Sequence, residues 1–302
     1  MSARLRALRP ETWRYLVGGV TGRLNPKQCP CCRSIARETV DRKHLHVLEE
    51  CQACGILYRF PYERLQQSIA FYQSAYVEPG LTTDLPSAQE LQHLLATGFK
   101  GSGKDFSYHL KIFAALGLFP GARILDFGAN WGYLTFQLRV AGFDADGFEI
   151  SRTRARFARN LGLEIMTDKS KLRGRYDAVY SSHVLEHTCN PRATLIEQLE
   201  WVRPGGLVIA HTPNGSKEWR RTDPRSFHAS WGQVHPVLLS GSFIERNFAS
   251  NPYYVSSDDR PESVMNWNRR SQLSRDLDGS GLFIVISKNQ WLFSDQRSTP
   301  RN

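Results

Sequence analysis

The sequence predicts an α/β protein in which a doubly wound, mostly parallel sheet follows a small N-terminal zinc ribbon. Three observations lead to this prediction. Strand-like and helical segments alternate from about residue 106 to residue 288. A glycine turn follows the first strand of that series, and the second strand ends on the acidic residue Glu149. Two C-x-x-C pairs precede the series, with the spacing of a structural zinc site.

The composition sets the size of the core and the classes of partner. The chain has 302 residues, 41% of them hydrophobic, which is enough for one full core and a smaller appended unit. The net charge of +10 suits an anionic partner, such as nucleic acid, a nucleotide-linked substrate or an acidic lipid surface, or simply an arginine-rich surface. No apolar run approaches the roughly 18 to 20 residues of a membrane span. We expect a basic tail over residues 1–25, no membrane span and a cytoplasmic protein.

The cysteine spacing favours metal binding over a disulfide or a redox-active pair. Each C-x-x-C turn places two thiolates on one side of a tight loop, and two such turns facing each other complete a tetrahedron. No secretory signal precedes the pairs. We expect one structural zinc in a ribbon over residues 26–60, with Cys31 and Cys189 outside the ligand set. The four predicted ligands are Cys29, Cys32, Cys51 and Cys54.

A helical connector and a linker are predicted between the ribbon and the alternating series, over residues 61–104. Apolar residues at helical spacing follow the ribbon, and proline and glycine then mark a loop. The best linker is the glycine-rich segment 98–104. The other expected elements are a β-prone stretch over 38–48, helices over 62–76 and 89–95, and a loop over 79–86.

Short apolar runs then alternate with helical patterns, which predicts a mostly parallel sheet covered on both faces. Ser151 and Asn190 stand at expected helix N-caps, and Pro191 suits the first helical position. We expect a turn over 203–206 and a long polar loop over 256–281. The expected helices cover 106–116, 131–140, 152–160, 191–201 and 238–248. The expected strands cover 124–127, 143–150, 163–166, 176–181, 207–211, 253–255 and 282–287.

The turn after the strand at 124–127 predicts a nucleoside-cofactor site at the carboxyl edge of the sheet. Gly128 lets the backbone turn tightly off the strand, and Gly132 lets the following helix approach a ligand. Asn130 stands where a G-x-G-x-G run has its middle glycine, so the glycine pattern alone is weak. Glu149 lies where a carboxylate can accept hydrogen bonds from both ribose hydroxyls.

The core from about residue 106 to residue 288 resembles the class I S-adenosylmethionine-dependent methyltransferases. The resemblance implies a seven-stranded, Rossmann-like sheet in a domain over residues 105–290, with a tail over 291–302. It rests on six segments that together are specific: 124–132 (ILDFGANWG), 147–151 (GFEIS), 176–180 (YDAVY), 184–187 (VLEH), 203–208 (RPGGLV) and 212–214 (TPN).

The front end resembles a narrower branch, in which a zinc-ribbon leader precedes methyltransferases that act on sugars and other natural-product intermediates. The matching residues are 51–58 (CQACGILY), Pro61 and 71–76 (FYQSAY). Because the chain ends near residue 302, we expect it to lack the additional C-terminal domain of the sugar C-methyltransferases of that branch.

The resemblance also implies a site for S-adenosylmethionine. Glu149 would hold the ribose and Asp168 would meet the adenine amino group, while the other implied residues line the methionine end. The aspartates also have simpler interpretations, Asp168 as a loop acid and Asp126 as a residue that caps a turn. The implied cofactor-binding residues are Asp126, Gly128, Asn130, Gly132, Glu149 and Asp168.

The loop after the fourth strand faces the transferring methyl group in this family. The enzyme must align donor and acceptor at roughly 3 to 3.5 Å and take a proton from a hydroxyl acceptor. His183 is the predicted base, with Glu186 and His187 beside it. Alternatively these three residues hold a divalent metal, because related quinone-pathway O-methyltransferases use an acid-and-imidazole cluster there. His228 and His235 are weaker candidates.

The string H-x-x-E-H over residues 183–187 is also a metalloprotease signature. We reject that function because the string follows a methyltransferase strand and no third ligand is placed.

We interpret the chain as a zinc-ribbon methyltransferase that O-methylates a small hydroxylated molecule, with a sugar or sugar nucleotide favoured. The alternative is an RNA methyltransferase, because ribbon leaders and positive charge also occur there. Residues 26–60 have no run of lysine and arginine interleaved with aromatic residues, which argues against it. The third class is a non-catalytic scaffold, and the intact glycine turn and Glu149 argue against that.

Overall fold

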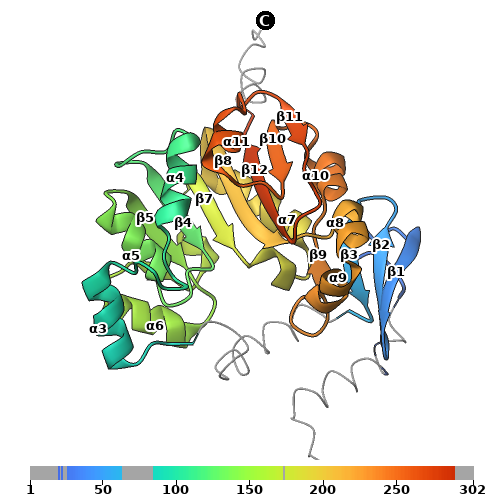
Figure 1. Cartoon of the computed structure of the whole chain (residues 1–302), viewed down its shortest axis with the longest axis horizontal. Coiled ribbons are helices and arrows are strands. Elements are labelled where there is room, and N and C mark those ends of the chain that lie inside the picture. The colour runs from blue at the N-terminus through green and yellow to red at the C-terminus, as the bar shows by residue number, and fades with distance from the viewer. Residues whose placement is uncertain (1–19, 21, 23–25, 63–83, 173, 290–302) are drawn as a thin grey trace, which may run out of the picture.

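The computed structural model of the chain describes residues 20, 22, 26–62, 84–172 and 174–289 (Figure 1). Two β-sheets organise this part of the chain, a large central one and a small one formed largely by the ribbon. The helix predicted over 62–76, apart from its first residue, and nearly all of both tails lie outside the described residues.

The large sheet has eight strands in the order β11-β10-β12-β8-β7-β4-β5-β6. The strands from β8 to β6 run parallel, whereas β12 pairs antiparallel with both β8 and β10. This confirms the predicted doubly wound, mostly parallel α/β fold. The strands are β4 (Arg123–Phe127), β5 (Asp144–Phe148), β6 (Ile165–Met166), β7 (Tyr176–Ser182), β8 (Val202–Pro213), β10 (Tyr253–Ser256), β11 (Gln272–Ser274) and β12 (Gly281–Ser287).

Helices cover both faces of this sheet because its central strands are apolar on both sides. In β8, Leu207 and Ile209 belong to one core, and Val208 and Ala210 to the other. Helices α4, α5 and α11 complete the first core, and α7 and α10 complete the second. No helix among the described residues is long and apolar enough to cross a membrane. The helices are α3 (Ala88–Thr97), α4 (Ser107–Ala115), α5 (Tyr133–Val140), α6 (Arg152–Asn160), α7 (Pro191–Trp201), α8 (Lys217–Thr222), α9 (Pro224–Ser230), α10 (Gly241–Phe248) and α11 (Pro261–Met265).

The small sheet joins segments that are far apart in the sequence. Its order is β1-β2-β3-β9, and β9 comes from the segment that follows β8 (Figure 1). Cys29, Cys51 and Cys54 also pack into the same apolar core as β7 and β8. The ribbon therefore shares its core with the large-sheet domain. Its strands are β1 (Arg37–Lys43), β2 (His46–Cys51), β3 (Leu57–Phe60) and β9 (Val237–Leu238).

Several expected elements need correction. The segment 256–281, expected as a loop, contains α11 and the edge strand β11, so the sheet has eight strands instead of seven. The 203–206 turn is part of β8, and the helix expected over 238–248 begins only at Gly241, because Leu238 pairs with Leu57. The 98–104 segment is packed, since Phe99 is fully buried and stacks on Trp131.

Candidate functional site

The loop between β4 and α5 is built on two glycines that no other residue can replace without strain. Gly128 and Gly132 have φ angles of 92° and 86°. A Cβ on Gly128 would lie 2.3 Å from Val184 Cγ2, and a Cβ on Gly132 would lie 2.5 Å from Leu163 Cδ1. Both positions therefore need glycine. For Gly132 the close approach is to Ala158 in α6 and to Leu163 just after it, which the sequence could not show.

Asn130 fits the same loop because asparagine tolerates the left-handed region, and its φ is 55°. Its buried side chain is also used, since Oδ1 accepts hydrogen bonds from the Trp131 N–H at 2.8 Å and from the Arg154 guanidinium. The substitution of the usual glycine thus adds a polar anchor between the loop and α6.

Glu149 follows β5 directly and holds the glycine loop and α6 together. Its side chain is 3% exposed. One oxygen accepts the Asn130 N–H at 2.9 Å, and the other accepts the Ser151 N–H at 2.7 Å. Burial raises the pKa of Glu149, while these N–H groups and Arg154 act in the opposite direction. Each carboxylate oxygen still has acceptor capacity for one more donor.

Asp126 lies near the end of β4, in the next strand of the sheet. It is 4% exposed, and its carboxylate accepts a hydrogen bond from Thr135 Oγ1 at 2.8 Å. Burial raises the pKa of Asp126 to about 7, against the lowering effect of Thr135. Asp126 therefore fastens the first turn of α5 to the sheet.

A cavity of about 520 Å³ opens at the ends of β5 and β6, where Phe148 and Ile150, the chain neighbours of Glu149, line it. Asp168 lies at this cavity as an exposed residue, and it accepts the Ser170 N–H at 2.9 Å, which holds its pKa below the usual range. Sequence reasoning singled out Asp168 but missed its neighbours, although they follow the same two strands. The lining residues are Phe148, Ile150, Arg152, Thr167, Asp168 and Lys169.

His183 and Glu186 form a pair at the end of β7. His183 adopts a φ of 53°, and its Nδ1 lies 2.9 Å from Glu186 Oε1. Glu186 is fully buried, and Thr212 Oγ1 donates to its other oxygen at 3.1 Å. The hydrogen bond with Glu186 raises the pKa of His183, whose side chain is 66% exposed. Burial acts to raise the pKa of Glu186, but the imidazole contacts lower it overall.

The ring of His187 lies beside that of His235. The short 3₁₀ turn Leu185–His187 replaces the helix that would have put His183 and His187 on one face. The Nδ1–H of His187 donates to Val234 O and that of His235 to Ser230 O, both at 2.8 Å. The rings lie 5.0 Å apart between centroids, and burial lowers the pKa of His187.

The residues that can therefore form a metal-binding triad are Glu186, His187 and His235. This combination was not predicted from the sequence. Their ligand atoms all lie within 4.8 Å of one another. With Nδ1–H of each ring fixed to a backbone carbonyl, a neutral imidazole turns the lone pair of Nε2 outwards, which is the usual orientation of a histidine ligand. His183, which was expected in this set, is held instead by Glu186. His228 bonds to Asp41 in the ribbon.

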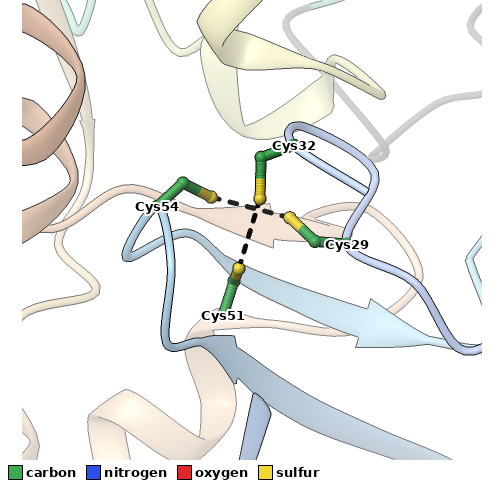
Figure 2. Close-up of side chains that lie close together, drawn as sticks. All are labelled: Cys29, Cys32, Cys51 and Cys54. Atoms are coloured by element: carbon green, nitrogen blue, oxygen red, sulfur yellow. Dashed lines mark hydrogen bonds between the residues drawn. The ribbon is translucent and has the colours of Figure 1, made fainter. Parts of the chain in front are cut away.

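The four ribbon cysteines converge on one point (Figure 2). The sulfurs of Cys29 and Cys54 are 3.6 Å apart, and those of Cys32 and Cys51 are 3.5 Å apart. Four sulfurs around zinc at about 2.3 Å would be separated by roughly 3.8 Å, so the cluster is able to bind zinc. Hydrogen bonds from Cys31 and Cys54 lower the pKa of Cys29, and Cys31 thus lies against the cluster and not apart from it.

Sequence reasoning also missed a partly buried imidazole pair formed by α4 and β8. The rings of His109 in α4 and His211 in β8 lie 5.1 Å apart. Burial lowers the pKa of His109 and lowers that of His211 to about 3. Desolvation thus disfavours the charged form of both rings. Their positions depend on the packing of α4 on the sheet, which no local pattern reveals.

Comparisons with known proteins agree on one class of domain. Residues 103–285 match the family described as methyltransferase domain. The chain is 30% identical over 188 residues to the ubiquinone biosynthesis O-methyltransferase of Cereibacter sphaeroides, which covers 59% of this chain and 70% of that protein. It is 27% identical over 148 residues to the protein of the same name from Bordetella bronchiseptica, which covers 42% of this chain. The match spans only 61% of the Bordetella protein's length.

A solved structure supports the fold. The plantazolicin methyltransferase BamL, in complex with a triazolic desmethylPZN analog and SAH, has a TM-score of 0.50 and 12% identity, and the alignment covers 74% of this chain and 97% of that one. At this level of identity the likeness supports the α/β architecture alone.

Proposed function

The chain belongs to the class I S-adenosylmethionine-dependent methyltransferase domain family, and from this premise we propose that it methylates a hydroxyl group of a small molecule. One observation carries the proposal. Glu149 is buried at the carboxyl edge of the sheet, beside the glycine loop and the 520 Å³ cavity, and its oxygens keep acceptor capacity for two ribose hydroxyls. When bound, S-adenosylmethionine supplies an already activated methyl group.

Each part of the site has a separate task in this proposal. Glu149 orients the ribose, the cavity at Ile150 and Thr167 takes the adenine, and the loop from Gly128 to Gly132 receives the methionine end. Asp168, which lines the cavity, meets the adenine amino group in this proposal. Alignment of donor and acceptor, together with exclusion of water, is the main contribution that the protein makes to methyl transfer.

His183 is the proposed general base. Its imidazole is exposed at the end of β7, and the Glu186 carboxylate fixes its orientation through Nδ1. That leaves Nε2 to accept the proton of an acceptor hydroxyl. The arrangement resembles other catalytic histidines that a buried carboxylate holds in one orientation.

Two metal sites complete the proposal. A structural zinc is held by Cys29, Cys32, Cys51 and Cys54, as their sulfur spacing supports. A divalent cation at the triad of Glu186, His187 and His235 would supply Lewis-acid assistance to the acceptor hydroxyl when bound. The chain's own contribution there is to present two Nε2 atoms and one buried carboxylate.

The acceptor class rests on two different likenesses. The N-terminal ribbon favours a sugar or sugar nucleotide, as in the zinc-ribbon branch of the family. The curated relatives are named for ubiquinone biosynthesis, which favours a hydroxylated aromatic ring. Both are small hydroxylated molecules.

Transfer of a labelled methyl group from S-adenosylmethionine to a panel of sugar nucleotides and dihydroxy-aromatic compounds tests the proposal. We expect product in at least one class. His183→Ala should lose roughly a hundredfold or more in turnover, because it removes the base, while cofactor affinity stays unchanged. Turnover of this variant equal to that of the wild type would show that the base lies elsewhere.

A further inference from the structure

The segment between α9 and β9 carries His235 and lies against the ribbon, beside β1 and β3 (Figure 1). We infer that the ribbon is the positioning element of the active site, which holds His235 against Glu186 and His187, and that Asp41 is its main positioning residue. The inference rests on the proposed metal triad. It assigns to the ribbon a task in the active site besides the binding of zinc.

Asp41 in β1 anchors the start of the segment. One of its oxygens, Oδ2, accepts hydrogen bonds from Trp231 Nε1 and from His228 Nδ1, both at 2.7 Å. Lys43, two residues along the same strand, lies 4.7 Å from the centre of the Trp231 ring and donates to the Trp231 carbonyl. Hydrogen bonds to a charged acceptor are the stronger kind. The ribbon therefore fixes both the side chain and the backbone of Trp231.

Arg59 in β3 brackets His235 from both sides. Its side chain is 1% exposed, and Nη1 donates to the carbonyl of Gly232 at 2.6 Å. Its backbone N–H donates to the carbonyl of Pro236 at 2.7 Å. Immediately afterwards Val237 pairs with Tyr58 in the small sheet. Two hydrogen bonds from Arg59 therefore hold the chain at Gly232 and at Pro236, on either side of His235.

An apolar cluster also packs the same segment against the ribbon. Leu48 and Leu57 of the ribbon pack with residues that flank the segment, and all of them are buried. Removal of large apolar side chains from water stabilises a contact of this kind. Without the ribbon these side chains would face water. The residues that the ribbon covers are Trp219, Phe227, Trp231 and Leu238.

The segment also contacts the loop after β7, which carries His183, Glu186 and His187. The His187 Nδ1–H donates to Val234 O, next to His235, and His235 itself is tied to Ser230 O. A shift of the segment would therefore move His235 and also release His187. Groups that orient metal ligands in this indirect way typically change metal affinity by about 10- to 100-fold when they are removed.

The test compares Asp41→Ala with Glu38→Ala. Both variants remove one carboxylate from β1, but Glu38 is exposed and makes only a 3.5 Å contact with Gln52. Asp41→Asn, which keeps an oxygen acceptor, serves as the conservative rescue. Each full-length protein is first checked for zinc content. Mn²⁺ binding is then titrated by electron paramagnetic resonance, because Mn²⁺ prefers a site with a carboxylate over a cluster of thiolates. Amide hydrogen exchange is followed over residues 228–238 and 183–187.

We expect Asp41→Ala to keep its zinc, to bind Mn²⁺ at least tenfold more weakly and to show faster amide exchange over both segments. Glu38→Ala should match the wild type. Asp41→Asn should recover most of the Mn²⁺ affinity that Asp41→Ala loses. Wild-type Mn²⁺ affinity together with unchanged exchange in Asp41→Ala would overturn the inference. If the wild type binds no Mn²⁺, the proposed metal triad is wrong, and the exchange data alone decide whether Asp41 positions both segments.

Discussion

At the scale of single residues, the cofactor loop combines conformational and packing requirements at the same positions. Gly128 needs a positive φ, and it also lies against Val184 in the proposed catalytic loop. The loops after β4 and β7 therefore approach each other closely at a point where no side chain fits. Any bulk at Gly128 would disturb both the cofactor loop and the residues that lead to His183.

Gly128→Ala tests this requirement. The added Cβ would lie 2.3 Å from Val184 Cγ2 at a φ of 92°, so we expect a loss of roughly 1 to 3 kcal/mol in unfolding free energy and weaker cofactor binding. Gly103→Ala is the matched control, because nothing lies within 4 Å of its Cβ. Denaturant unfolding measures both. Equal stability of the two variants would contradict the packing argument.

Asp126 gives the stability of the protein a dependence on pH. Burial raises its pKa from 3.8 to about 7, so the folded state holds the proton more tightly than the unfolded state. The contribution of this group to stability therefore falls as pH rises from about 4 to about 7. Asp126→Asn cannot ionise, and its stability relative to the wild type should increase by about 3 to 4 kcal/mol across this range. Thermal or urea unfolding at several pH values measures this difference in stability between the variant and the wild type. If the difference is the same at pH 4 and pH 8, Asp126 is not a buried protonated carboxyl.

The same residues show which features of the site can be predicted from the sequence. The spacing of Gly128, Gly132 and Glu149 places all three at the carboxyl edge of the sheet, because that edge is fixed by the order of strand, turn and helix. The hydrogen bond from the Asn130 N–H to Glu149 depends on a left-handed residue that the sequence showed only as a missing glycine. Likewise, His235 joins His187 through a tertiary contact 48 positions away along the chain, which no local pattern could indicate.

At the scale of elements, long apolar runs identified the central strands correctly, while short paired elements escaped detection. Strand β9 has only two residues and exists because β3 offers it a partner. Strand β11 similarly depends on the edge presented by β10. The segment Leu185–His187 is a 3₁₀ turn instead of the expected helix, and His187 lies beside His235. Tertiary pairing overrides local propensity in each case.

The assignment of the four ribbon cysteines as zinc ligands can be tested by mutation. Cys51→Ser should lose the bound metal and several kcal/mol of stability, because four thiolates are needed to close a structural zinc site. Cys31→Ser is the matched control, since its thiol contacts the cluster but lies outside the four converging sulfurs. Metal analysis and thermal unfolding of protein purified without chelator measure both effects. Equal loss of metal in the two variants would overturn the ligand assignment.

At the scale of the whole molecule, the predicted boundary between ribbon and catalytic domain does not separate two cores. Cysteines of the ribbon pack with the large-sheet strands, and Leu48 and Leu57 pack with Trp219 and Phe227 from beyond β8. A change in composition marks where the ribbon ends along the sequence, but it carries no information about which distant segment covers it. The described part of the chain is therefore better regarded as one folding unit.

The account depends most on the cofactor site at Glu149. Calorimetry with S-adenosylhomocysteine, the product form of the cofactor, tests it directly in the wild type, in Glu149→Gln and in Asp144→Asn. The last variant removes the same charge from the opposite end of β5. We expect one site in the wild type, unchanged affinity in Asp144→Asn and at least about tenfold weaker binding in Glu149→Gln, because charged hydrogen bonds to the ribose are lost. No binding by the wild type, or unchanged affinity in a folded Glu149→Gln variant, would contradict the account.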